Sequence, residues 1–125
     1  MRSAIHDEIK ALIVDDEIDV CYLLSSILKH KNLQASYVNS ISEAKRVLQE
    51  GHHSIVFLDN HLPDGFGINF VDEIRKLNPD VKIVMITAHD TNKDRSRAYE
   101  QGVDQFIGKP FTRQSILNAI ENLMN

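Results

Sequence analysis

The chain has 125 residues, of which 42% are hydrophobic and 26% charged, so it can bury the core of one domain and has little length for a second. The formal net charge of −4 argues against direct nucleic-acid binding, which needs a basic patch. No apolar run approaches the roughly 20 residues of a membrane span, and the first residues lack a signal-peptide core. We therefore expect one cytoplasmic domain over residues 1–125 that does not bind membranes, with residues 1–8 as an N-terminal extension.

Five short apolar runs rich in β-forming residues recur along the chain and predict five strands. They cover Ile9–Val14, Leu33–Val38, Ser54–Leu58, Lys82–Ile86 and Asp104–Ile107. The third and fourth runs are almost continuously apolar, which is typical of parallel strands that are covered on both faces.

The segments between these runs have the three- and four-residue apolar spacing of amphipathic helices. They predict helices over about Ile18–His30, Ile41–Glu50, Ile68–Leu77 and Asn92–Gln101, and a fifth helix that begins after Thr112. Ser40 and Glu43 are a candidate capping box for the second helix, and Thr112 is a candidate N-cap for the fifth.

A regular alternation of strand and helix predicts a parallel sheet with right-handed crossovers and helices on both faces. We expect an α/β fold of the flavodoxin-like (βα)5 kind, a doubly wound five-stranded sheet with strand order 2-1-3-4-5. Half of a Rossmann fold is less favoured, because no glycine-rich turn follows the first strand.

Polar side chains follow four of the five predicted strands. Asp15 and Asp16 follow the first strand, Asp59 the third, Thr87 the fourth and Lys109 the fifth. Ligands of open α/β sheets bind outside the carboxyl ends of the strands, so these side chains should meet at one edge. Each of them alone is more often a cap, a turn residue or a surface residue, and it is their joint placement that indicates a site.

The residue types in this set favour phosphoryl chemistry. Crowded carboxylates repel one another, and Mg²⁺, which binds through one or two carboxylates plus phosphate, would relieve that repulsion. One carboxylate could be a nucleophile that forms an aspartyl phosphate. Lys109 could neutralise phosphate charge, and the Thr87 hydroxyl could donate a hydrogen bond to a phosphate oxygen.

Five segments resemble the motifs of bacterial two-component response-regulator receiver domains, including the chemotaxis regulators. They are Ala11–Glu17, Ile55–Asp59, Leu62–Gly67, Ile83–Ala88 and Gly102–Phe111. Any one segment is weakly specific, whereas all five in this order and spacing are highly specific.

The resemblance implies a metal site around a phosphorylated aspartate. Asp59 would be the phosphorylated nucleophile, and Asp16 and Asp59 would bind Mg²⁺, or Mn²⁺ in its place, directly. Asp15 would act mainly through a metal-bound water. The main-chain carbonyl of His61 would be a further ligand.

The resemblance also implies a switch. Thr87 would bond the phosphoryl oxygen after activation, and Lys109 would pair with it. Phe106 stands where many members have tyrosine, at an aromatic position that turns inward when the switch engages. Pro110 matches a proline preceded by a cis peptide bond, here from Lys109.

The partners implied are a sensor histidine kinase or a histidine phosphotransfer protein as donor in a phosphorelay, and a downstream protein target or an attached effector domain. A homodimer through the fourth helix, fifth strand and fifth helix is a further expectation. Whether the chain is a stand-alone regulator or a domain of a longer one stays open. His61 and His89 would flank the site, either as ordinary loop residues or as groups that control access to the acyl phosphate.

A different class of protein, a Mg²⁺-dependent phosphohydrolase that turns over free substrate, is the competing interpretation. Such an enzyme usually needs a second acidic group near its nucleophile as general acid. Asn60 and His61 follow Asp59, so the sequence has no Asp-x-Asp pair there. We therefore expect a phospho-acceptor signalling domain, not a metabolic enzyme, and one that catalyses its own phosphorylation and dephosphorylation.

Overall fold

Five parallel strands form a single sheet in the computed structural model, which describes residues 9–124. They are β1 (Lys10–Val14), β2 (Gln34–Val38), β3 (Ile55–Asp59), β6 (Lys82–Thr87) and β7 (Gln105–Gly108). Their order in the sheet is β2-β1-β3-β6-β7, which is the predicted order 2-1-3-4-5 in chain order, so the fold class is confirmed. A short antiparallel hairpin of β4 (His61–Leu62) and β5 (Gly65–Phe66) follows β3.

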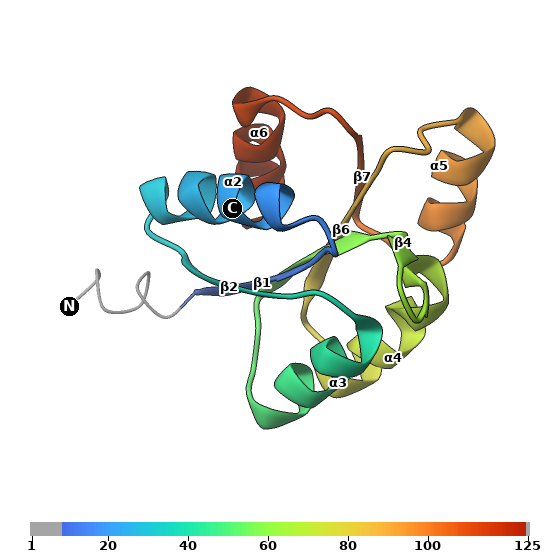
Figure 1. Ribbon diagram of the computed structural model, residues 1–125, viewed down its shortest axis with the longest axis horizontal. Coiled ribbons are helices and arrows are strands. Elements are labelled where there is room, and N and C mark those ends of the chain that lie inside the picture. Colours follow the sequence, from blue (N-terminus) through green and yellow to red (C-terminus); the bar gives the residue numbers. More distant parts are fainter. Residues whose placement is uncertain (1–8, 125) are drawn as a thin grey trace.

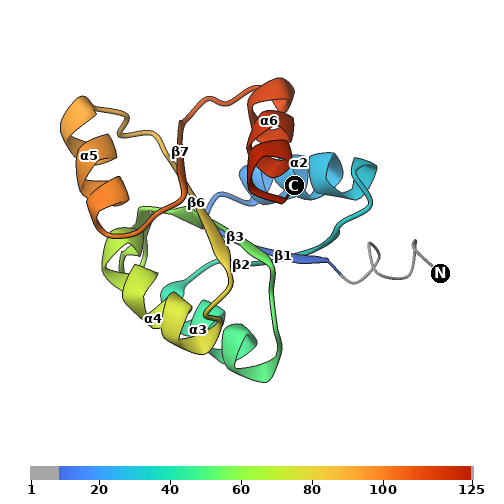
Figure 2. The same cartoon turned by 180° about the vertical axis from the view of Figure 1, so that it is seen from behind.

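The helices cover both faces of the sheet (Figures 1 and 2). They are α2 (Ile18–His30), α3 (Ile41–Glu50), α4 (Val71–Leu77), α5 (Asn92–Glu100) and α6 (Arg113–Met124). Helices α2 and α6 lie on one face, and α3, α4 and α5 lie on the other (Figure 1). None of the helices within residues 9–124 has the length and apolar character needed to cross a membrane.

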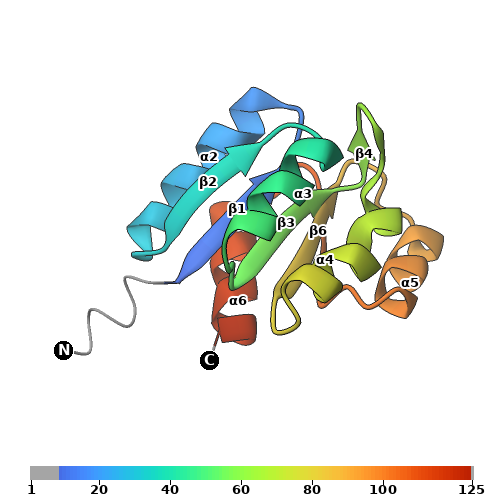
Figure 3. The same ribbon diagram turned by 90° about the horizontal axis from the view of Figure 1, so that it is seen from below.

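Two apolar cores result from the alternation of side chains along the strands. In β1, Leu12 and Val14 pack with α3 and α4, whereas Ala11 and Ile13 pack with α2 and α6. Every residue of β3 is buried, which explains its nearly continuous apolar sequence. Strands β2, β1, β3 and β6 are seen side by side in Figure 3.

The predicted helix starts are borne out with two differences in detail. The Ser40 hydroxyl accepts a hydrogen bond from the Glu43 amide, but the Glu43 carboxylate accepts from the amide of Asn39 and not from that of Ser40. The segment Gly67–Phe70, where the third helix was expected to begin, is a 3-10 turn that leads into α4.

Side chains from α4 fix the amino-terminal ends of β6 and β7. Arg75 donates to the carbonyls of Val81 and Gly102, at 2.7 and 2.5 Å, and to the Asp104 carboxylate at 2.8 Å. The same Asp104 oxygen accepts from the Ile83 amide at 2.8 Å. One guanidinium therefore ties together the two segments that enter neighbouring strands.

We predict that Asn78→Ala destabilises the fold by about 2–4 kcal/mol, because it leaves buried peptide groups without partners. Asn78 is 2% exposed, accepts from the His53 amide at 2.6 Å and donates to the Leu48 carbonyl at 3.2 Å. Denaturant unfolding would measure the loss. Asn122→Ala, at an exposed position, is the control, and equal midpoints for the two variants would contradict the prediction.

Candidate functional site

The carboxyl ends of four strands bring the predicted polar residues together. Asp59 ends β3 and Thr87 ends β6, while Asp15 and Lys109 directly follow β1 and β7. The Lys109 ammonium lies 3.0 Å from the Asp15 carboxylate and 3.7 Å from the Asp59 carboxylate. Asp15, Asp59 and Thr87 are all buried, so this edge holds acidic groups that are largely withdrawn from water.

Glu17 is a third carboxylate at this ammonium, and no role for it was expected from the sequence. Its Oε1 atom lies 2.6 Å from Lys109 Nζ, although 61% of its side chain is exposed. Oxygen atoms of Asp15, Glu17 and Asp59 lie within 4.8 Å of one another. Because oxygen ligands in such a cluster suit a hard divalent cation, these three residues could hold a metal ion. The acidic run Asp15-Asp16-Glu17 is the sequence feature that could have indicated a role for Glu17.

Asp16, expected as a direct metal ligand, lies outside this cluster. It is exposed and makes no hydrogen bond or ion pair with any described residue. Its role toward a metal, and that of the His61 carbonyl, stay predictions.

Asp15 is held by a set of contacts that the sequence did not predict. Its amide donates to the Val38 carbonyl, and its carboxylate accepts from the Glu17 amide at 2.9 Å. Its carbonyl accepts from the Asn39 side chain at 2.9 Å and from the Cys21 thiol at 3.3 Å. The carboxylate therefore has a fixed direction toward Lys109.

The chain passes very close to Asp59 on its way into α4. A Cβ atom at Gly67 would collide with the Asp59 carbonyl oxygen, so only glycine fits there. The Asn60 side chain accepts from the Ile68 amide at 2.9 Å, and the Asn60 carbonyl accepts from the Gly67 amide at 2.8 Å. These bonds fix the loop that carries the His61 main chain past Asp59.

Burial and crowding shift the acid–base properties of the cluster. Burial, and then the charge of Asp15, raise the pKa of Asp59 to about 6, against the opposing effect of Lys109. Burial also raises the pKa of Asp15. For Lys109, burial acts to lower the pKa, but bonds with Glu17 and Asp15 and the charge of Asp59 outweigh it, so the net shift is upward.

The predicted switch residues lie on neighbouring strands, Thr87 at the end of β6 and Phe106 in β7. The Thr87 hydroxyl oxygen accepts a hydrogen bond from the His89 amide at 3.2 Å. The Phe106 ring, in β7, lies inside the domain with 3% of the residue exposed. The peptide bond between Lys109 and Pro110 is cis, the isomer that the sequence predicted.

His61 and His89 pair beside Asp59. Their ring centroids are 4.1 Å apart with the planes tilted by 32°, and Phe66 contacts His61 edge-on at 5.3 Å. Both histidines line a hollow of about 410 Å³ with Asn60, among other residues. A second hollow of about 410 Å³, more apolar, is lined by Lys109 together with Val20, Leu23, Pro110 and Phe111, among other residues.

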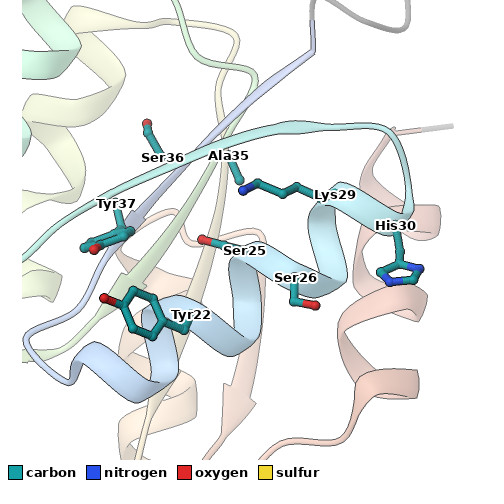
Figure 4. A pocket seen from close by; sticks show the side chains of 8 residues that line it. All are labelled: Tyr22, Ser25, Ser26, Lys29, His30, Ala35, Ser36 and Tyr37. Atoms are coloured by element: carbon teal, nitrogen blue, oxygen red, sulfur yellow. The ribbon is translucent and has the colours of Figure 1, made fainter.

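A larger hollow of about 750 Å³ lies between α2 and the edge strand β2, and Figure 4 shows its lining. The rings of Tyr22 and Tyr37 meet edge-on there at 5.9 Å, and Ser25 and Ser26 project from α2. None of its lining residues is acidic or belongs to the cluster around Lys109. It therefore lacks the chemistry that the strand ends provide.

Comparison with known proteins decides the family. The response regulator receiver domain family matches residues 11–121. The chain belongs to this family. The chain is thus a receiver domain, and its acidic cluster consists of Asp15, Glu17 and Asp59.

The curated relatives of this receiver domain are longer transcriptional regulators. The phosphate regulon regulatory protein PhoB of Escherichia coli is 29% identical over 117 residues, which is 92% of this chain and 51% of PhoB. The CpxR homolog of Haemophilus influenzae is 33% identical over 115 residues, 92% of this chain and 50% of the relative. The chain therefore spans about half the length of these relatives.

Among solved structures, the beryllofluoride-activated receiver domain dimer of NtrC4 superposes with a TM-score of 0.86. It is 31% identical, and the match covers 91% of this chain and 94% of that one. The receiver fold is thus shared along nearly the whole of both chains.

We predict that Asp59→Asn stabilises the metal-free receiver domain at about pH 7.5. The pKa of Asp59 is raised to about 6, so the folded chain binds the carboxyl proton of Asp59 more tightly than the unfolded chain does. The free energy of unfolding should therefore fall as the pH rises from about 4 to about 6. Asp59→Asn removes the charge and should raise the free energy of unfolding by about 1–3 kcal/mol at about pH 7.5, with little effect at about pH 3.5.

Denaturant unfolding in the presence of a chelator measures this difference. Asp80→Asn removes an exposed carboxylate and is the matched control. A gain in Asp59→Asn that is as large at about pH 3.5 as at about pH 7.5 would mean that the buried charge is not its cause.

Proposed function

We propose that this receiver domain accepts a phosphoryl group on Asp59 from a phosphohistidine of a sensor histidine kinase or a histidine phosphotransfer protein. The observation that carries the proposal is the buried Asp59 carboxylate, 3.7 Å from the Lys109 ammonium at the carboxyl edge of the sheet. With a pKa of about 6, Asp59 is mostly ionised at neutral pH and available as a nucleophile.

In the transfer, an Asp59 carboxylate oxygen forms a bond to phosphorus while the bond from phosphorus to the donor's imidazole nitrogen breaks. Lys109 stabilises the charge that spreads over the phosphoryl oxygens in a loose transition state. The hollow beside Lys109, which has an apolar lining in part, supports the approach of the donor protein from that side. Hydrolysis of the acyl phosphate, catalysed by the same groups, would return the domain to its starting state.

The reaction requires Mg²⁺, or Mn²⁺ in its place, in this proposal. Asp16 and Asp59, with the main-chain carbonyl of His61, would hold the ion, and Asp15 would orient a metal-bound water. A bound Mg²⁺ supplies positive charge that neutralises both the carboxylates and the incoming phosphoryl oxygens. The crowding of Asp15, Glu17 and Asp59 around one ammonium supports this need for a cation.

The output of the domain is a change in its binding surface. The Thr87 hydroxyl would turn to the phosphoryl oxygen, and the space it leaves would favour the inward position of Phe106. The face formed by α5, β7 and α6 would then bind a downstream protein, an attached effector domain or a second copy of the chain. The solved NtrC4 relative is itself a receiver domain dimer. His61 and His89, at the mouth of the site, would set the access of water.

We predict that the wild-type chain gains one phosphoryl group when it is incubated with a small phosphodonor and Mg²⁺, and that Asp59→Asn gains none. Intact-mass spectrometry measures the incorporation. Asp19→Asn, at an exposed position on α2, is the control and should be modified like the wild type. Equal incorporation of phosphate in Asp59→Asn and the wild type would contradict the assignment of Asp59 as the acceptor.

The choice between Asp16 and Glu17 as a metal ligand can be tested separately. We predict that Asp16→Asn weakens Mg²⁺ binding at least about tenfold, whereas Glu17→Gln weakens it less. Glu17 is already engaged by Lys109 at 2.6 Å, while the Asp16 carboxylate makes no bond to a described residue. Titration calorimetry measures both affinities. A larger loss in Glu17→Gln would instead assign the ion to the cluster of Asp15, Glu17 and Asp59.

A further inference from the structure

Two side chains of α5 contact Phe106 from outside the sheet. The Arg95 guanidinium lies over the Phe106 ring, 4.9 Å from its centroid, and the Tyr99 hydroxyl oxygen accepts a hydrogen bond from the Phe106 amide at 3.1 Å. Residues four apart lie on the same face of a helix, one turn from each other. Because β7 is an edge strand, its outer amides need partners outside the sheet, and Tyr99 supplies one.

The direction of the Arg95 side chain is set by the loop that follows Thr87. Asp90 accepts from Arg95 Nε at 2.6 Å and from Nη2 at 3.1 Å, a two-bond pairing of guanidinium and carboxylate. The two side chains are 40% and 37% exposed, so the pair is too solvated to add much stability by its charge. Its two-bond geometry instead fixes the plane of the guanidinium over the ring.

Asp90 also packs against β7, at Gly108, beside the end of β6 where Thr87 lies. A Cβ atom at Gly108 would collide with the Asp90 carboxylate, so that carboxylate packs directly on the glycine backbone. Gly108 is the register partner of Thr87, and the amide of the next residue, Lys109, donates to the Thr87 carbonyl at 2.8 Å. The contacts therefore run without a gap from the end of β6 through Asp90 and Arg95 to Phe106.

We propose that Arg95 is a positioning residue of the switch, which couples the loop of Asp90 to the inward position of the Phe106 ring. The coupling rests on the proposed function, because phosphorylation at Asp59 is what would move Thr87 and the loop behind it. Loss of the cation–ring contact should shift the balance between inward and outward rings by about two- to fivefold. Lysine would replace arginine only in part, because it keeps the positive charge but cannot make the two-bond pair with Asp90.

The test follows Phe106 by fluorine NMR of protein labelled with 4-fluorophenylalanine. The chain has five phenylalanines, so the resonance is assigned by its loss in Phe106→Leu. Beryllofluoride with Mg²⁺ serves as the phosphoryl mimic. We expect Arg95→Ala to shift the Phe106 resonance in the free protein and to raise the half-saturating beryllofluoride concentration about two- to fivefold. Arg95→Lys should restore only part of either change.

Lys93→Ala, which removes an exposed cation from the same helix, is the control and should change neither reading. Asp90→Asn should act like Arg95→Ala, and the double variant should be no worse than either single one, because the two residues act as a unit. If Arg95→Ala matches Lys93→Ala in both readings, the inference is wrong. If the wild type takes up no beryllofluoride, the proposed function fails, while the Phe106 resonance of free Asp90→Asn, which keeps the guanidinium, still tests the coupling.

Discussion

The ammonium of Lys109 is the contact on which the organisation of this receiver domain depends. It balances three carboxylates that would otherwise repel one another, and two of them, Asp15 and Asp59, are buried. An uncompensated charge in such surroundings is costly, so the nearby ammonium favours the ionised form of these carboxylates against the effect of burial. The chain itself therefore supplies positive charge to this site, and a divalent ion or a phosphoryl group would have to displace contacts that already exist.

The strands, their order and the residues at their ends could be predicted from the sequence because each rests on a local pattern. Apolar runs and helical spacing define the elements, and the alternation of elements leaves few topologies. Once the sheet is parallel, the residues after each strand must share an edge, which is why Asp15, Asp59, Thr87 and Lys109 were placed correctly. Most element ends moved by at most one residue, and the third helix began three residues later than expected, at Val71, since the local pattern does not determine where hydrogen bonding starts and stops.

The side-chain partners could not be predicted in the same way. Glu17 and Asp16 are neighbours of the same charge, and only the path of the backbone into α2 decides which of them reaches Lys109. Asn39 and Asp15 are 24 residues apart, so their bond depends on how two loops lie at the sheet edge. The contact of Arg95 with Phe106 likewise depends on the placement of α5 against β7, to which the polar sequence of α5 gives no clue.

The guanidinium of Arg75 gives the two ends of the sheet unequal freedom. It bonds to Val81, Gly102 and Asp104, so β6 and β7 are joined across their entry points by side-chain bonds as well as by the sheet ladder. At the opposite end, β6 finishes at Thr87, and the same two strands lead into the loops that carry Asp90 and Lys109. The entry ends of both strands therefore carry side-chain bonds in addition to the ladder that pairs the strands along their length. We expect a rearrangement beside Asp59 to fall in the carboxyl-terminal loops and in α5, because these segments lie at the end of the sheet that Arg75 does not tie.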